Sequence, residues 1–136
     1  MIHVFCSQRG TGKTKSLIKL ANAKAEKAKG TVIYIDDDKG PMFNLDSRIR
    51  MIITDDFKLK DYNEMYGFLC GILSEDYDIE TIFIDSLCNI ISGNLEDAAH
   101  LFLKMEKLAH NYKLEFYINI NADYSEIPLF LQKYAA

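Results

Sequence analysis

The chain has 136 residues, a formal net charge of −4 at pH 7 and an apolar fraction of 49%. This length predicts one domain over residues 1–136, and the acidic balance gives no basic field for nucleic-acid binding. No apolar stretch is long enough to span a membrane, and a predicted strand at residues 2–6 leaves no room for a signal peptide. The three separated cysteines, Cys6, Cys70 and Cys88, favour free thiols in a reducing compartment, so we expect a cytoplasmic protein.

Strands and helices alternate along the whole chain. Apolar periodicity predicts strands at 2–6, 31–36, 51–54, 81–85 and 115–121, and helices at 13–29, 62–73, 95–112 and 126–134. Asp61 and Glu64 have the spacing of a capping box, Asn94 is expected to cap the third helix, and Ser125 is expected to begin the last, with Pro128 in its first turn. The second and fourth strands are apolar on both faces, as in parallel strands covered by helices. We predict an α/β three-layer sandwich with a mostly parallel five-stranded sheet.

A phosphate-binding pattern lies directly after the first predicted strand. Residues 7–14 read Ser-Gln-Arg-Gly-Thr-Gly-Lys-Thr and open the first helix. Glycines let backbone N–H groups wrap a polyphosphate, the lysine reaches the β- and γ-phosphates, and the threonine hydroxyl ligates Mg²⁺. A serine replaces the first glycine of the G-x-x-x-x-G-K-[ST] pattern, at some conformational cost. The predicted phosphate-binding residues are Ser7, Gln8, Arg9, Gly10, Thr11, Gly12, Lys13, Thr14 and Lys15.

Carboxylates at two strand ends are candidates to complete the site. In open α/β sheets, ligands bind outside the carboxyl ends of the strands. Asp85 follows the fourth strand and is expected to hold Mg²⁺ through a water, together with Thr14. The second strand ends in Asp36-Asp37-Asp38, and alternation along an extended chain predicts Asp36 and Asp38 on one side and Asp37 on the other. Asp36 or Asp38 is therefore the predicted catalytic group that orients the attacking water, with Lys13 as the catalytic cation; a solvated acidic turn is the alternative.

Two further sets of side chains are weaker candidates. Asn119 or Asn121, at the end of the fifth strand, could contact the γ-phosphate, although a turn asparagine is nearly as good an interpretation. Arg9, Arg48 or Arg50 could serve as an arginine finger in a neighbouring molecule. For Arg48 and Arg50 we favour a solvated position before the third strand.

With these residues placed, the chain resembles a small bacterial P-loop NTPase. The stretch 32–38, Val-Ile-Tyr-Ile-Asp-Asp-Asp, is similar to the second strand of RecA-like ATPases, which implies Asp38 as the catalytic base. The same stretch is similar to the Asp-x-Asp segment of the ParA/MinD partition ATPases, and Tyr77-Asp78 ahead of 82–86 is similar to their segment before the Mg²⁺-binding aspartate. In place of the early lysine of those ATPases, the nearest basic residue is Arg9, one position later. The resemblance implies a P-loop NTPase fold and ATP rather than GTP as the ligand.

The function expected from these features is ATP binding with slow Mg²⁺-dependent hydrolysis. The chain has little beyond a nucleotide-binding core, so its output is expected through self-association or a protein partner, as a switch or assembly component. One alternative is a nucleotide-sensing module without turnover. A less favoured one is a small-molecule kinase, since no arginine follows Arg50 to build an arginine-rich lid.

Overall fold

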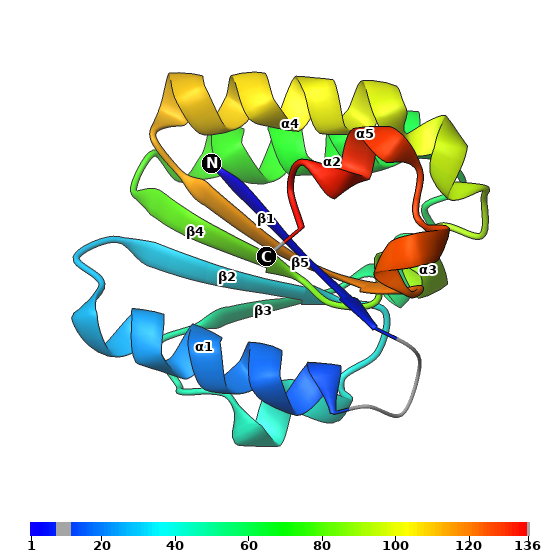
Figure 1. The fold of residues 1–136 in the computed structure, drawn as a ribbon. Coiled ribbons are helices and arrows are strands. Elements are labelled where there is room, and N and C mark those ends of the chain that lie inside the picture. The colour runs from blue at the N-terminus through cyan, green and yellow to red at the C-terminus, as the bar shows by residue number, and fades with distance from the viewer. Residues whose placement is uncertain (8–11, 136) are drawn as a thin grey trace.

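A computed structural model of the chain describes residues 1–7 and 12–135. Five strands form one sheet in the order β1-β5-β4-β2-β3, and every neighbouring pair is parallel (Figure 1). The strands are β1 (Ile2–Ser7), β2 (Thr31–Asp36), β3 (Arg50–Ile53), β4 (Ile79–Ile84) and β5 (Glu115–Asn121). The predicted α/β class and five strands are confirmed, and the sheet is parallel throughout rather than mostly.

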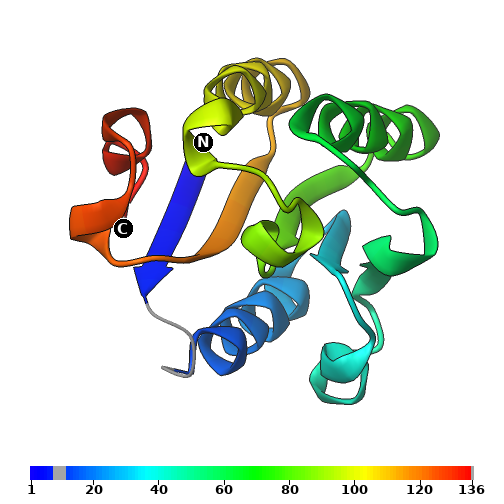
Figure 2. The same ribbon diagram turned by 90° about the vertical axis from the view of Figure 1, so that its right-hand side faces the viewer.

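Helices cover both faces of this sheet. They are α1 (Lys13–Lys27), α2 (Tyr62–Glu75), α3 (Leu87–Ile90), α4 (Ala99–Tyr112) and α5 (Leu129–Gln132). In Figures 1 and 2, α1 lies on one face while α2 and α4 lie side by side on the other, which gives three layers. Among the described helices, none combines the length and the apolar character that crossing a membrane requires.

The third and last predicted helices differ from the observed ones. Residues Leu95–Ala98 form a 3₁₀ turn before α4, and Asn94 makes no side-chain capping bond. The last helix is shorter than the predicted 126–134: a 3₁₀ turn occupies Tyr124–Glu126, and α5 spans only Leu129–Gln132. Pro128 explains the break, because a proline disfavours helical backbone at the preceding residue, and Ile127 is indeed extended, with ψ of 151°.

Helix α2 begins with the predicted cap. The Glu64 backbone N–H donates to the Asp61 carboxylate at 2.8 Å. The Glu64 side chain accepts a hydrogen bond from the Lys60 N–H at 2.8 Å. In a standard capping box the donor would be the N–H of the cap residue itself, here Asp61. Both bonds satisfy backbone donors at the helix start.

The side-chain alternation of the strands divides the core into two parts. The larger part lies between the sheet and α2 with α4, and the smaller part lies under α1. Under α1, three neighbouring strands contribute a row of stacked rings, with centroids 6.2 Å apart for Tyr34 and Phe83 and 5.0 Å for Phe83 and Tyr117. The rings lie at the middle of the strands. Further along each of these strands, toward its carboxyl end, the residues on the same face are polar.

Gly30, in the turn between α1 and β2, makes a testable contribution to this fold. A Cβ on Gly30 would lie 2.0 Å from the Asp78 carbonyl oxygen, which accepts a 2.8 Å bond from the Thr31 N–H. Gly30→Ala should therefore lower the free energy of unfolding by more than about 2 kcal/mol, in the range typical of overpacking. Gly67→Ala is the matched control, since nothing lies within 4 Å of its added Cβ, and alanine in a helix is favoured by about 1 kcal/mol. Denaturant unfolding of both variants measures the difference; equal stabilities would contradict the close approach at Gly30.

Candidate functional site at the carboxyl edge of the sheet

Four neighbouring strands end in polar residues on the face that α1 covers. Side chains alternate along a strand, so the residue two positions after a buried ring on the α1 face lies on that face too. Asp36 follows Tyr34 in this way, Asp85 follows Phe83, and Asn119 follows Tyr117. Ser7 and Asn121 end β1 and β5 opposite each other. The strand ends therefore collect a polar row beside the first turn of α1.

Helix α1 begins at this row with the predicted glycine-lysine-threonine segment. Gly12 has a φ of 82°, a left-handed conformation that favours glycine, and its carbonyl accepts the Ser16 N–H at 3.1 Å. The Lys13 ammonium donates to the Ser7 carbonyl at 2.8 Å and to the Asn121 side-chain oxygen. Thr14 and Lys15 are exposed beside it. The other predicted phosphate-loop residues, Gln8, Arg9, Gly10 and Thr11, lie outside the described residues.

The Asp85 side chain is buried below this surface and accepts three hydrogen bonds. Only 1% of the residue is exposed. One carboxylate oxygen accepts from the Tyr34 hydroxyl at 2.9 Å, and the other accepts from Asn119 at 3.1 Å and Ser86 at 3.3 Å. Burial first, and then the neighbouring Asp85 charge, raise the pKa of the Tyr34 hydroxyl, so that it remains a donor. These donors fix the orientation of the Asp85 carboxylate. The side chain of Asn119, a candidate for a phosphate contact, is thus hydrogen-bonded to this carboxylate.

The three aspartates at the end of β2 gather on one side, and the predicted separation of Asp37 is wrong. Strand β2 ends at Asp36, and the chain bends over the next three residues. Alternation therefore stops there, and carboxylate oxygens of Asp36, Asp37 and Asp38 all lie within 4.8 Å of one another. Asp36 is 5% exposed and accepts the Asp37 N–H at 2.7 Å, whereas Asp38 is exposed and accepts the Gly40 N–H at 2.8 Å. The triplet is thus one cluster of carboxyl groups with a buried member.

Burial of Asp36 has a measurable consequence for stability. Burial, a hydrogen bond with Asp37 and the Asp85 charge raise the pKa of Asp36 from 3.8 to about 8. Between these values the folded protein binds more protons than the unfolded chain, so the free energy of unfolding should fall as pH rises across this interval and change little from this cause above it. Asp36→Asn removes this contribution, and its stability relative to the parent should increase with pH. Denaturant unfolding of the parent and of Asp36→Asn, in a chelator at about pH 5 and about pH 9, measures this change. The same difference in stability between the two proteins at both pH values would contradict a buried, uncharged Asp36.

Two hollows join the α1 start to the acidic triplet. The first, of about 450 Å³, is named here the Lys13 hollow; it is lined by Gly12, Lys13, Thr14, Lys15, Ser86, Asn89 and Asn121. The second, of about 340 Å³, is named the Asp hollow; its polar lining includes Thr14, Lys15, Asp36, Asp37, Asp38, Ser86 and Asn89. Because Thr14, Lys15, Ser86 and Asn89 line both, one elongated ligand can contact the lysine and the carboxylates together.

Sequence reasoning missed two residues of this region. Tyr34 could have been found from alternation, since it precedes Asp36 by two positions on the same face. Asn89 could not, because the four-residue helix α3 that carries it has no clear periodicity or cap. Ser86, which directly precedes α3, has a φ of 58°, a left-handed conformation that is uncommon for serine and turns the chain over the end of β4.

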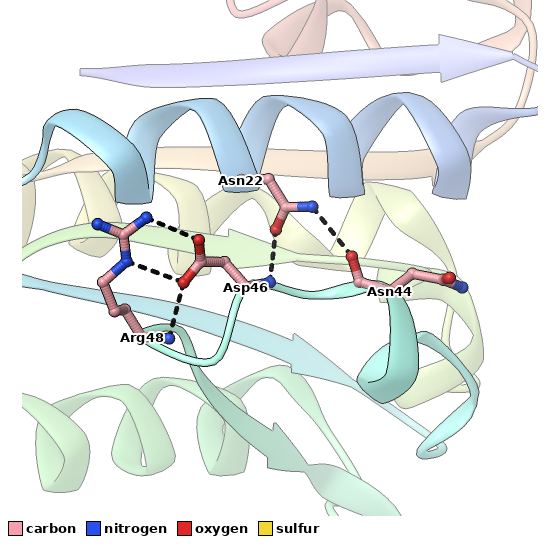
Figure 3. Close-up of polar contacts among 4 residues, drawn as sticks. All are labelled: Asn22, Asn44, Asp46 and Arg48. Atoms are coloured by element: carbon pink, nitrogen blue, oxygen red, sulfur yellow. Dashed lines mark hydrogen bonds and ion pairs between the residues drawn. The ribbon is translucent and has the colours of Figure 1, made fainter.

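The described arginines lie away from the triplet, on the approach to β3 and at its start. The Arg48 guanidinium forms two hydrogen bonds with the Asp46 carboxylate, at 2.9 and 2.7 Å (Figure 3). Asn22 of α1 accepts the Asp46 N–H and donates to the Asn44 carbonyl, which ties this loop to α1. Arg50 is exposed and lies 3.5 Å from the Asp76 carboxylate. Both arginines thus have carboxylate partners within the chain, in the exposed positions we favoured.

No protein-family model and no curated protein matches this chain. Its function must therefore be inferred from the residues at this edge of the sheet.

Proposed function

We propose that the protein is a P-loop nucleotide-binding protein that binds ATP and hydrolyses it slowly with Mg²⁺, as a switch or assembly component. The observation that carries this proposal is that the Lys13 hollow and the Asp hollow share four lining residues. A cation at a helix start and a cluster of carboxylates therefore line two adjoining hollows. Polyphosphate requires the first group and Mg²⁺ favours the second.

The phosphates are placed by the first turn of α1. Backbone N–H groups at a helix start are unsatisfied within the helix and carry partial positive charge. Here α1 has no acidic residue in its first turn, and Gly12 makes no side-chain cap, so neither feature competes with an anion. Lys13 adds a full charge beside them. A bound phosphate would share the Lys13 ammonium with Ser7 and Asn121.

The donors present fit Mg²⁺, which takes six oxygen ligands and keeps several waters. Thr14 is exposed and lines both hollows, and the triplet lines the second of them. Asp85 already accepts three hydrogen bonds and is 1% exposed, which supports a contact through water rather than direct ligation. Mg²⁺ would neutralise the triplet and polarise the phosphate oxygens.

Hydrolysis would use Asp36 or Asp38 to orient the attacking water. Both carboxylates face the Asp hollow, beside the place where the metal and the γ-phosphate are proposed to lie. The raised pKa of Asp36 would fall again when a cation binds next to it, which makes it a competent proton acceptor at neutral pH. The preference for ATP, the switch role and the need for self-association or a partner rest on the family resemblance and on the small size of the chain.

The Thr14 hydroxyl gives a direct test of the metal site. Thr14→Ala should weaken nucleotide binding in Mg²⁺ by roughly tenfold or more, the worth of a contact to a charged group, and should hardly change metal-free binding. Thr14→Ser is the matched control because it keeps the hydroxyl. Asp85→Asn should act like Thr14→Ala if its unfolding curve shows an intact fold. Titration calorimetry with ATP, with and without Mg²⁺, gives the comparison; equal Mg²⁺ dependence in parent and Thr14→Ala would contradict the metal site.

A further inference from the structure

A third hollow adjoins the triplet and has no part in the proposed hydrolysis. It measures about 460 Å³, within the size range of small-molecule sites, and we name it the Lys58 hollow. Asp37, Thr54, Lys58, Lys60, Asn89 and Ser92 contribute to its lining. Asp37 and Asn89 also line the Asp hollow, so the two spaces share a boundary.

The turn that carries the two lysines is fixed to the end of β2. Thr54 is 3% exposed, and its hydroxyl donates to the Asp36 carbonyl at 3.3 Å. Its own carbonyl accepts the N–H groups of Phe57 and Lys58, at 2.9 and 3.1 Å. These bonds hold Lys58 at a φ of 51°, a conformation that costs a lysine about 1 kcal/mol or more. The position of this turn is therefore tied to the position of the triplet.

The charges around the Lys58 hollow indicate the chemistry of its ligand. The ammonium groups of Lys58 and Lys60 make no ion pair or hydrogen bond within the described part of the chain. They are suited to an anionic group. The carboxylates of Asp37 and Asp55 on the same lining only accept hydrogen bonds when ionised, so they are suited to hydroxyl groups. One small molecule with an anionic group and hydroxyls would satisfy both kinds of residue.

We propose that the Lys58 hollow is a second ligand site, for a small hydroxyl-bearing organic phosphate. Lys58 and Lys60 bind the phosphate, and Asp37 and Asn89 bind the hydroxyl end next to the triplet. The proposal that a ligand binds here depends only on the Lys58 hollow and the side chains that line it. Its relation to the nucleotide, as a co-ligand whose binding is coupled to that of ATP through Asp37 and Asn89, rests on the proposed function.

The test uses glycerol 3-phosphate as the probe and glycerol as its uncharged counterpart. Lys13→Ala serves as the starting protein, because it weakens phosphate binding at the α1 start. Two-dimensional amide NMR should show saturable shifts at Thr54 and Ser92, which line the Lys58 hollow and neither of the other two, with glycerol 3-phosphate and none with glycerol. Adding Lys58→Ala and Lys60→Ala should weaken the affinity at least tenfold. Lys27→Ala with Lys29→Ala makes the same charge change at the far end of α1, on exposed residues, and should leave the affinity within about twofold.

The outcomes separate this inference from the proposed function. No saturable shift at these amides, equal binding of glycerol, or equal affinity in the Lys58/Lys60 variant would overturn the second site. The proposed function is judged independently, by ATP binding to the parent protein. Binding of the probe together with a failure to bind ATP would keep the second site and remove the nucleotide. If both ligands bind to the parent, saturating ATP should change the affinity for glycerol 3-phosphate about fivefold or more, and an unchanged affinity would overturn the coupling.

Discussion

Lys13→Ala should reduce ATP affinity roughly tenfold to a thousandfold while leaving the fold intact. Losing a charge-assisted contact to a phosphate typically costs a few kcal/mol. The fold should survive because Lys13 is half-buried at the start of α1, outside the two apolar core clusters. Its described contacts include the Ser7 carbonyl and the Asn121 side chain. Titration calorimetry on the folded variant measures the loss.

Lys19→Ala is the control for this change. Lys19 lies further along α1, is exposed, and has the same charge. Its replacement should leave ATP affinity nearly unchanged, which shows that the effect at Lys13 is not one of net charge. ATP binding by folded Lys13→Ala at the parental affinity would exclude a phosphate site at the start of α1.

Asp36→Asn or Asp38→Asn should lower turnover about a hundredfold to ten-thousandfold, the usual worth of general-base assistance. Asparagine keeps the size of the side chain and removes the proton acceptor. Nucleotide affinity should hold or rise, since a negative charge near the phosphates is lost. Single-turnover hydrolysis, measured beside equilibrium binding, separates the two effects.

The clustering of the triplet decides the control for this experiment. Asp37 shares the Asp hollow with its neighbours, so Asp37→Asn is a third test rather than a reference. Asp56→Asn is a better reference, because Asp56 is exposed and lines none of the three hollows. Parental turnover in all three triplet variants would place the base elsewhere. If the parent shows no turnover at all, the nucleotide-sensing module becomes the better interpretation.

The strands and long helices were predictable because their apolar patterns are strong. The bounds of β2 and β5 agree with the prediction, and the cap of α2 follows from Asp61 and Glu64. Short elements were not predictable. Helix α3 has four residues and depends on a left-handed Ser86, and the 3₁₀ turn at Gly40–Asn44 has no periodicity to reveal it. These are elements fixed by their surroundings rather than by local preference.

The candidate site was predicted as a set of residue types, but not in its detailed arrangement. Strand ends place Asp36 and Asp85 at one edge by general rules of parallel sheets. The bend after Asp36 could not be read from three identical residues, and it decides that Asp37 joins the cluster. The contact of Asn121 with Lys13 depends on β5 lying between β1 and β4, a strand order that the sequence pattern leaves open.

Calorimetric titration of the parent protein with ATP and Mg²⁺ tests the central claim most directly. ADP and GTP, and ATP without Mg²⁺, are titrated in parallel. We expect saturable binding of ATP with one site per chain, tighter with Mg²⁺ than without it and tighter than for GTP. Absence of saturable binding by any of these nucleotides, under conditions in which the protein is folded, would contradict a nucleotide site between Lys13 and the acidic triplet.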